Sequence, residues 1–273
     1  LDAERLYALS QEERSRKHED KMLAAIKQAV ERAPKSRWAE EALFAVGNYF
    51  WVQLDRPRAA SYYERLVARF PAGRNVIAAH WRLTWVAYLD QRAETASLIE
   101  EHLRRFPGSL YTENALYWLG RTAERSGNPS LARSYYLKSV GRFPQTYFGA
   151  QSATRLRAIG SEPTEPAESL ALLSAPSPLP ALDAPIPPAA ADRWERAMAL
   201  RSIAFDASAE LELRASYAAT GSPRLLWEAA RSALDAGRYG PAMLAVRQVF
   251  PQLEARKIDD VPVEVWRIVY PLP

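Results

Sequence analysis

Hydrophobic and small residues in the stretch from Ala115 to Pro144 recur at three- and four-residue spacing, in two runs separated by polar residues. This spacing places side chains on one face of an α-helix. The pattern therefore predicts two amphipathic helices joined by a short turn. The first run comprises Leu116, Leu119, Gly120 and Ala123, and the second comprises Ala132, Tyr135, Tyr136 and Val140.

Residues 127–129, Gly-Asn-Pro, mark the turn, because glycine frees the backbone and proline cannot continue a helical hydrogen-bond ladder. Ser130 stands where the N-cap of the second helix is expected. Gly120 and Ala132 should let the two helices approach closely, since helices pack tightly where neither carries a large side chain. Pro144, which follows a phenylalanine, closes the unit.

The same two-helix unit recurs along the first part of the chain. Its closing prolines are spaced by 37, 36 and 37 residues, and a period of this length with two helices per unit is typical of an α-solenoid. The prolines are Pro34, Pro71, Pro107 and Pro144, and the equivalent pairs inside the units are Gly47 and Gly120, Leu43 and Leu116, Ala59 and Ala132, and Tyr63 and Tyr136.

The unit that ends at Pro107 is one residue out of step, with Ala96 in the small-residue position and Leu83 in place of the glycine. In its small residues and closing proline the pattern resembles the tetratricopeptide repeat, although these units are longer. The fold class predicted is all-α: an α-solenoid, or superhelix, of antiparallel helix pairs.

The remaining pattern divides the chain into four regions: repeats at 1–160, a proline-rich linker or strap at 161–191, further helical repeats at 192–251, and a junction at 252–273. Asp192 is the expected N-cap where the helical pattern resumes. Residues 2–33 are expected to be mostly helical, and later helices are predicted at about 37–54, 57–69, 75–90, 92–105, 110–126, 130–142, 147–159, 193–204, 206–219, 223–236, 239–249 and 263–269.

Eight prolines fall within residues 161–191, and the only charged residues there are acidic. Proline stiffens a chain into extended conformations, so this region is either a linker or a strap that lies on a helical surface. Its leucines favour partial docking; they are Leu170, Leu172, Leu173 and Leu182.

Charge is unevenly distributed. Residues 1–160 hold 25 Lys and Arg against 17 Asp and Glu, a net charge of +8, whereas residues 161–273 hold 11 against 15, a net charge of −4. Solvated helix faces account for such charges, but the excess would also attract the first region to an anionic polymer. No block of five basic residues favours nucleic acid.

Composition excludes several further classes. The chain has no cysteine, which rules out disulfides and thiol catalysis, and no apolar run of 18 residues that would predict a membrane span. The chain begins at Leu1, from which a processed or trimmed N-terminus is expected. Because the end resembles a lead-in to further sequence, a missing C-terminal part is also expected.

The sequence shows no catalytic constellation. No nucleotide-binding loop or hydrolase elbow is present, and His18, His80 and His102 lack the spacing of a metal site. Four pairs of adjacent carboxylates occur: Glu12-Glu13, Glu40-Glu41, Glu100-Glu101 and Asp259-Asp260. Adjacent side chains diverge on a helix, so the first three pairs are expected to lie on solvated helix surface. We predict no catalytic residue, no cofactor-binding residue, no cofactor and no metal ligand.

Two tyrosine pairs, Tyr62-Tyr63 and Tyr135-Tyr136, occupy the same position in two repeats. Adjacent residues on a helix cannot share one face, so core packing explains one member of each pair and the other must point elsewhere. Aromatic rings on a solenoid surface could stack against sugar rings or against a peptide.

Two segments go beyond a generic repeat: Tyr147–Gly160 (YFGAQSATRLRAIG) and Val261–Pro273 (VPVEVWRIVYPLP). The first is similar to the segment that follows the helical repeats in soluble lytic murein transglycosylases. The second resembles the junction before the catalytic domain of that family, with matching residues Glu264, Trp266, Arg267, Tyr270 and Pro271.

This resemblance implies a periplasmic or cell-envelope helical superhelix that carries a lysozyme-like domain, which cleaves peptidoglycan without hydrolysis. The catalytic glutamate of the family lies in a Glu-Ser motif beyond the junction, and this sequence has no such motif in that context. The chain would then be the non-catalytic scaffold of a lytic transglycosylase, with peptidoglycan glycan strands and the missing catalytic domain as its partners.

The alternative hypothesis is a tetratricopeptide-type adaptor of the cell envelope that binds protein partners in a groove. Both hypotheses rest on the same all-α solenoid. They differ in the partner that the helical surface would bind, a glycan strand or a protein segment.

Overall fold

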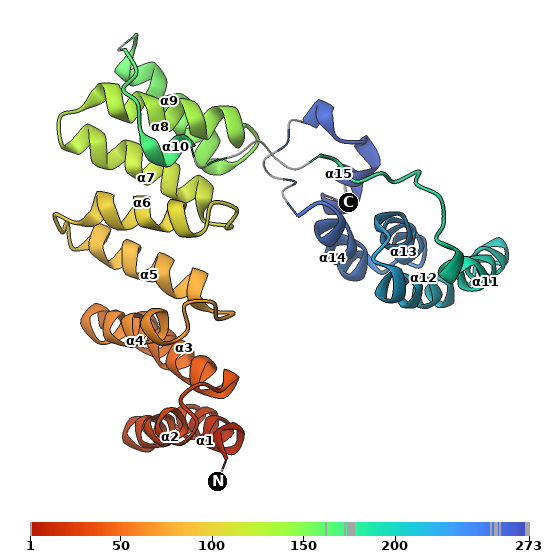
Figure 1. The fold of residues 1–273 in the computed structure, drawn as a ribbon, viewed down its shortest axis with the longest axis horizontal. Helices are drawn as coiled ribbons and strands as arrows, with labels where there is room; N and C mark the ends of the chain where they lie inside the picture. Colours follow the sequence, from red (N-terminus) through yellow and green to blue (C-terminus); the bar gives the residue numbers. More distant parts are fainter. Residues whose placement is uncertain are drawn as a thin grey trace. The chain divides into compact units, whose positions relative to one another are not determined.

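The structure of the protein is a computed structural model, and it describes residues 2–161, 163–171, 173, 178–251, 253, 256 and 258–270. Within these ranges the chain forms helices and no strand, as Figure 1 shows. The all-α solenoid of antiparallel helix pairs is therefore confirmed. None of the helices in these ranges is both long enough and apolar enough to cross a lipid bilayer.

The predicted helices all form, with ends within about three residues of the expected positions. The α-helices are α1 (Ala3–Ser15), α2 (Glu19–Arg32), α3 (Arg37–Val52), α4 (Arg56–Arg69), α5 (Val76–Leu89), α6 (Thr95–Arg105), α7 (Thr112–Arg125), α8 (Pro129–Arg142), α9 (Tyr147–Ile159), α10 (Glu168–Ala171), α11 (Ala191–Ser202), α12 (Asp206–Thr220), α13 (Pro223–Asp235), α14 (Tyr239–Val249) and α15 (Val263–Val269).

The chain divides into two compact units. Unit 1 comprises Leu1–Tyr136 with Ala158–Leu173, and unit 2 comprises Leu137–Arg157 with Ser174–Pro273. The boundary falls inside α8, and the proline-rich region contributes residues to each unit.

In unit 1 the helices α1/α2, α3/α4 and α5/α6 pack as pairs, and successive pairs stack on one another, with α7 following on α6 (Figure 1). The turns inside the pairs share one conformation. Lys17, Leu54, Gln91 and Gly127 all have positive φ, between 53° and 76°, at spacings of 37, 37 and 36 residues. Only one of the four is glycine, so this periodicity of the backbone is not visible as a glycine pattern.

Gly47 and Gly120 occupy equivalent positions in two repeat units, and the reason is steric. A Cβ atom added to Gly47 would lie 2.5 Å from a ring carbon of Tyr63, and one added to Gly120 would overlap Tyr136 equally closely. Both tyrosine rings are fully buried between the helices of their pairs. The glycines therefore make room for a tyrosine on the second helix of the pair.

The pair α5/α6 shows that the register predicted for it was wrong. Thr84 and Thr95 are the buried small residues there, whereas Leu83 and Ala96 are only partly buried. The residue that occupies the tyrosine position is Ile99, which is buried. Because isoleucine is smaller than tyrosine, the facing helix can carry threonine in place of glycine.

Two helix starts also differ from the prediction. The side chain of Asn128, not of Ser130, caps α8, since its Oδ1 accepts a hydrogen bond from the amide of Leu131 at 3.0 Å. Helix α11 begins at Ala191, directly after a turn of 3₁₀-helix at Pro188–Ala190, so Asp192 lies inside the first turn. There its charge favours the helix through the dipole without serving as the N-cap.

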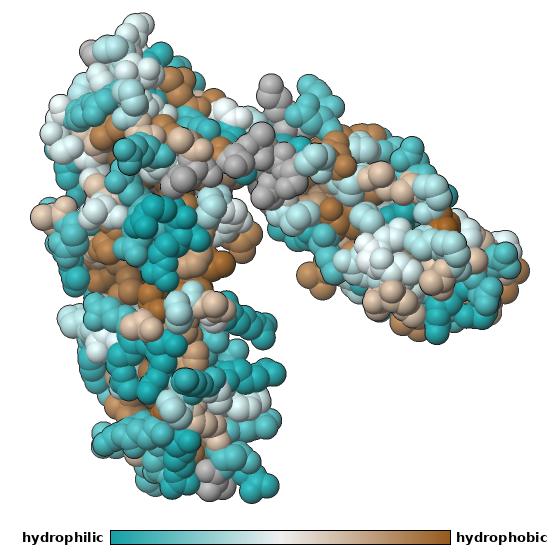
Figure 2. All heavy atoms as spheres, in the orientation of Figure 1, coloured by the Kyte–Doolittle hydropathy of each residue, from teal (hydrophilic) through white to brown (hydrophobic). Residues whose placement is uncertain are grey.

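Unit 2 has its own hydrophobic core, which α11 to α15 build. Trp227 of α13 meets the ring of Phe250 at 6.5 Å, where Phe250 and Pro251 end the pair α13/α14. Residues 178–190 belong to this unit, and Arg224 holds them by donating to the carbonyl oxygen of Ala184 at 2.7 Å. Figure 2 shows hydrophilic side chains over much of the visible face of each unit, with hydrophobic ones between them.

Candidate functional site

A cluster of partly exposed aromatic rings lies where α5 meets α7 in unit 1. Trp85 and Tyr88 come from α5 and Trp118 comes from α7. The ring centroids of Trp85 and Trp118 are 4.8 Å apart, and those of Tyr88 and Trp118 are 4.5 Å apart. We call these three residues the aromatic surface.

Two guanidinium groups of unit 1 lie on aromatic rings, one of them on a ring of the aromatic surface. The guanidinium of Arg125 lies 4.8 Å from the ring centre of Tyr88, and that of Arg82 lies 4.7 Å from the ring centre of Trp51 at the end of α3. Within the described part of the chain neither arginine has a carboxylate partner. An aromatic ring attracts a cation but does not neutralise it, so both guanidinium groups can still accept a carboxylate ligand.

Below the aromatic surface, Trp81 joins it to the core. The indole of Trp81 is 6.4 Å from Trp85 and stacks on Tyr111 at 5.3 Å. Trp81 is buried, with 7% of its surface exposed. This packing fixes the backbone from which Trp85 and Tyr88 project, so the exposed rings are held on a rigid element.

Two histidines that the sequence left apart are neighbours behind Trp81. His80 and His102 are both buried, and their Nδ1 atoms are 3.2 Å apart. Burial above all, and then the neighbouring His80 and Arg105, lower the pKa of His102 to about 3. The pKa of His80 is also lowered, mainly by burial and then by Arg105. Both rings are therefore neutral near pH 7 and act as packing and hydrogen-bonding groups.

The sequence predicted no metal site around the histidines. In the ranges that the structure describes, no cluster of three or more His, Asp or Glu side chains could hold a metal ion. The second nitrogen of His102 contacts the hydroxyl of Ser109 at 3.1 Å, so that histidine already has two polar neighbours.

The carboxylate pairs do not all lie on solvated surface as expected. Glu40 is buried, and its Oε1 accepts a hydrogen bond from the backbone amide of Asn75 at 2.5 Å. Glu13 is also buried, beside His18 at 2.8 Å. These side chains hold loops between helices, a role that depends on tertiary neighbours and that adjacent positions in sequence do not reveal.

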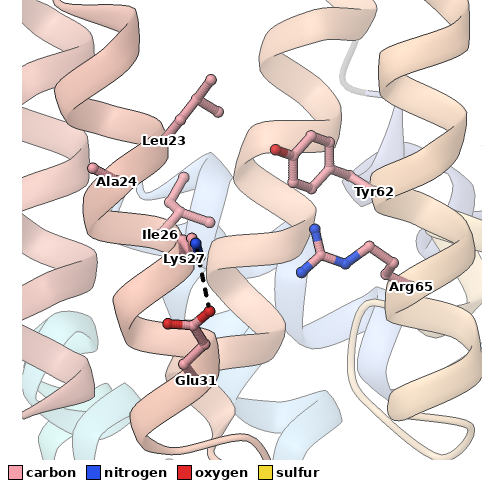
Figure 3. A pocket seen from close by; sticks show the side chains of 7 residues that line it. All are labelled: Leu23, Ala24, Ile26, Lys27, Glu31, Tyr62 and Arg65. Atoms are coloured by element: carbon pink, nitrogen blue, oxygen red, sulfur yellow. Dashed lines mark ion pairs between the residues drawn. The ribbon is translucent and has the colours of Figure 1, made fainter.

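In each tyrosine pair the two rings point in different directions, as predicted, but the pairs differ in exposure: Tyr62 is partly exposed, whereas Tyr135 is as buried as Tyr136. Tyr63 and Tyr136 are the core members, and burial raises the pKa of Tyr63 to about 12. Tyr62 instead lines a pocket of about 360 Å³ between α2 and α4, where Arg65 also extends toward α2 (Figure 3). Leu23, Ile26 and other residues of α2 form the opposite wall.

The predicted junction residues lie in and after α15 of unit 2. Glu264 and Arg267 are exposed, while Trp266 packs against Tyr270 with ring centres 6.1 Å apart and donates to the carbonyl of Ile258 at 3.1 Å. Pro271 lies outside the described residues. Their assignment as a junction to a catalytic domain stays a prediction.

Comparison with known families identifies one segment of the chain. Residues 114–146 match the tetratricopeptide repeat. This segment holds α7, the turn at Gly127 and α8, so the two-helix unit with the best-formed pattern is a tetratricopeptide-like repeat. No curated protein sequence matches the chain.

Among solved structures, a tetratricopeptide repeat protein from Parabacteroides merdae is similar over 98% of both chains, at 14% identity and a TM-score of 0.47. YrrB, described as a TPR protein with an unusual peptide-binding site, is similar over 84% of this chain and 92% of its own, at 13% identity and a TM-score of 0.34.

Proposed function

We propose that this protein is a tetratricopeptide-type scaffold that binds segments of partner proteins, and that the aromatic surface of unit 1 is a binding site. The observation that carries the proposal is the cluster of Trp85, Tyr88 and Trp118, partly exposed and flanked by guanidinium groups without a carboxylate partner in the described chain. Such a surface is costly to leave uncovered and is typical of binding hot spots.

The chemistry of the surface favours a particular kind of partner. Trp and Tyr rings offer large contact area with few rotatable bonds, which keeps the entropic cost of binding low. Arg82 and Arg125 can each take a carboxylate, and the net charge of +8 on residues 1–160 steers acidic segments toward this region. The expected ligand is therefore a peptide segment with acidic and apolar side chains.

A phage-displayed library of random peptides tests this function. We expect enrichment of acidic, apolar sequences on the intact chain, and a loss of their binding of about tenfold or more in Trp118→Ala, since hot-spot aromatics dominate interface energetics. Arg125→Glu should weaken the same peptides, whereas Arg133→Glu on α8 should not. Failure to enrich any sequence, or binding that survives Trp118→Ala in a folded variant, would contradict the proposal.

The second candidate is the scaffold of a lytic transglycosylase in the periplasm or cell envelope. It is supported by the resemblance of Tyr147–Gly160 and Val261–Pro273 to that family and by the positive charge of the first 160 residues, which suits the carboxylates of peptidoglycan. It ranks second because the comparisons name tetratricopeptide repeat proteins and not this family.

Sedimentation of the chain with purified sacculi separates the two candidates. The scaffold hypothesis predicts salt-sensitive binding to sacculi with no fall in their turbidity, because the chain would lack the catalytic glutamate. Absence of binding at low salt would leave the protein-binding function as the better explanation.

A further inference from the structure

The proline-rich strap, defined here as residues 163–171, already shows how this solenoid holds an extended segment. The backbone of Glu165 lies on α8, where the hydroxyl of Ser134 donates to the Glu165 carbonyl at 2.6 Å and accepts from the Glu165 amide at 3.0 Å. Asn128 adds a hydrogen bond of 2.8 Å to the Glu165 carboxylate. One serine thus pairs with both backbone groups of a residue in the strap, as a neighbouring β-strand would.

The strap continues over the next residue of α8. Tyr135 is 1% exposed, and its hydroxyl donates to Glu100 of α6 at 2.5 Å. The single-turn helix α10 follows the extended part and contacts α6. The strap therefore covers Ser134 and Tyr135 along the line where α6 and α8 meet, on the second helices of two successive pairs.

The same three residues occur two repeats earlier, where the described part of the chain leaves the serine exposed and the first tyrosine partly exposed. Residues 61–63 and 134–136 both read Ser-Tyr-Tyr, 73 residues apart. The third members, Tyr63 and Tyr136, are equally buried in the cores of their pairs. The first two differ: Ser134 and Tyr135 are buried under the strap, whereas Ser61 is exposed and Tyr62 is partly exposed.

The uncovered copy has the shape and the charge of a binding site. Tyr62 and Arg65 face Leu23 and Ile26 across the pocket of about 360 Å³ between α2 and α4 (Figure 3). Lys27 and Glu31 also line the pocket and form an ion pair of 3.9 Å with each other, which leaves Arg65 as the cation that can bind a carboxylate. Arg65 is exposed and has, in the described residues, a contact with the Tyr62 ring at 5.3 Å but no carboxylate partner. The strap that covers the equivalent surface has glutamate as its only charged residue type.

We propose that the groove between α2 and α4 binds an extended, proline-containing acidic segment of a partner protein, in the way that the strap binds between α6 and α8. Ser61 pairs with the backbone of the segment, Tyr62 is covered by it, and Arg65 takes one of its carboxylates. This groove lies on the second helices of the pairs, so it is a site separate from the aromatic surface and does not depend on the function proposed for that surface.

The strap sequence itself is the probe. A fluorescein-labelled peptide of residues 163–171 (PTEPAESLA) is titrated with the full chain, in which the surface of Ser134 and Tyr135 is already occupied. Saturable binding with one site per chain is expected, and Tyr62→Ala should weaken it about tenfold, as for an aromatic anchor of an interface. Ser61→Ala, Arg65→Ala and a peptide with glutamine at both glutamates should each weaken binding severalfold.

Three controls decide between explanations. Glu64→Ala, on an exposed face of α4 outside the pocket, should leave the affinity unchanged. Binding that is lost in Trp118→Ala but unchanged in Tyr62→Ala would place the peptide on the aromatic surface and contradict the proposal. If Ser134→Ala changes the affinity and Ser61→Ala does not, the peptide exchanges with the strap and the proposal is wrong. Absence of binding also contradicts it.

The oligomeric state tests the choice of occupant. Sedimentation velocity of the full chain should show no self-association through this groove. If the chain forms dimers that Ser61→Ala or Tyr62→Ala dissociates, the strap of a second copy fills the groove, and the assignment to a partner protein is overturned.

Discussion

The helix pairs of unit 1 follow two designs. In α3/α4 and α7/α8 a tyrosine of the second helix lies against a glycine of the first, whereas α5/α6 has Ile99 and Thr84 at these places and a buried histidine pair nearby. The turns inside the pairs nevertheless share one backbone conformation. The difference teaches that the repeat conserves the summed volume between two helices and not the residue at either position.

The largest expected effect comes from filling the space that the tyrosines need. Gly47→Ala and Gly120→Ala should each destabilise the chain by about 2–3 kcal/mol, because the new methyl overlaps a buried ring that cannot retreat. Gly141→Ala, where an added Cβ meets nothing within 4 Å, should be neutral or slightly stabilising. Urea unfolding measures the difference. If all three variants behave alike, the tyrosine–glycine contact does not separate the two designs.

The second-largest expected effect is a dependence of stability on pH, and it concerns only the pair α5/α6. The folded pKa of His102, about 3, lies below its unfolded value of about 6.5, so the unfolded chain binds the proton more tightly. Above pH 6.5 the neutral His102 ring costs the folded chain no free energy of unfolding. Below pH 6.5 the free energy of unfolding falls until the pH reaches about 3. Between pH 7 and pH 5 the loss is about 2 kcal/mol for this histidine, from the linkage slope of about 1.4 kcal/mol per pH unit.

His102→Gln keeps a donor and an acceptor in the site but cannot titrate there. Urea unfolding at pH 7 and pH 5 should show that this variant loses less stability on acidification than the parent chain, even though it is less stable at pH 7. His18→Gln is the control, since His18 is half exposed and lies in α1/α2. If His102→Gln loses as much free energy of unfolding between pH 7 and pH 5 as the parent chain, His102 does not make α5/α6 sensitive to acid.

A third effect separates the two Ser-Tyr-Tyr copies. Ser134→Ala removes both hydrogen bonds to the backbone of Glu165 and should cost about 1–2 kcal/mol of local stability in the strap. Hydrogen exchange of the Glu165 amide should accelerate in this variant. Ser61→Ala should leave both global stability and exchange at Glu165 unchanged, because Ser61 is exposed. Equal effects of the two substitutions would contradict the difference in coverage.

The sequence predicted the helices well because proline, phenylalanine and helical spacing are local signals. Each Phe-Pro step marks the end of a second helix, at Phe70, Phe106 and Phe250 among others. The register of α5/α6 was missed because it depends on Ile99, a residue on the facing helix. Capping by Asn128 was missed because serine and asparagine are both good N-cap residues and stood two positions apart.

The candidate sites were harder to predict than the fold. Trp85 and Trp118 lie on different repeats, and no local motif shows that their rings meet. The repeated Ser-Tyr-Tyr was visible as two tyrosine pairs, but its meaning depends on which copy the strap covers. That distinction exists only in three dimensions, since the strap joins residues 31 positions apart at Ser134 and Glu165.

The smallest effect tests whether the turns are as uniform as the helix pairs that they join. Leu54 and Gln91 adopt the left-handed conformation that Gly127 adopts at the same place, and a side chain there costs about 1 kcal/mol. Leu54→Gly should therefore stabilise the chain by up to about 1 kcal/mol, reduced by the greater freedom of glycine in the unfolded chain, and Gly127→Ala should destabilise it by about the same amount. Leu54 is 80% exposed, so its replacement removes little packing. The expected result is that the urea midpoint rises for Leu54→Gly and falls for Gly127→Ala. That result would show that the packing of the helix pair imposes the left-handed turn, because the turn then forms even where its residue disfavours that conformation. A destabilised Leu54→Gly would mean that Leu54 makes a contribution of its own at the turn, and that the pairs differ there as well as in their cores.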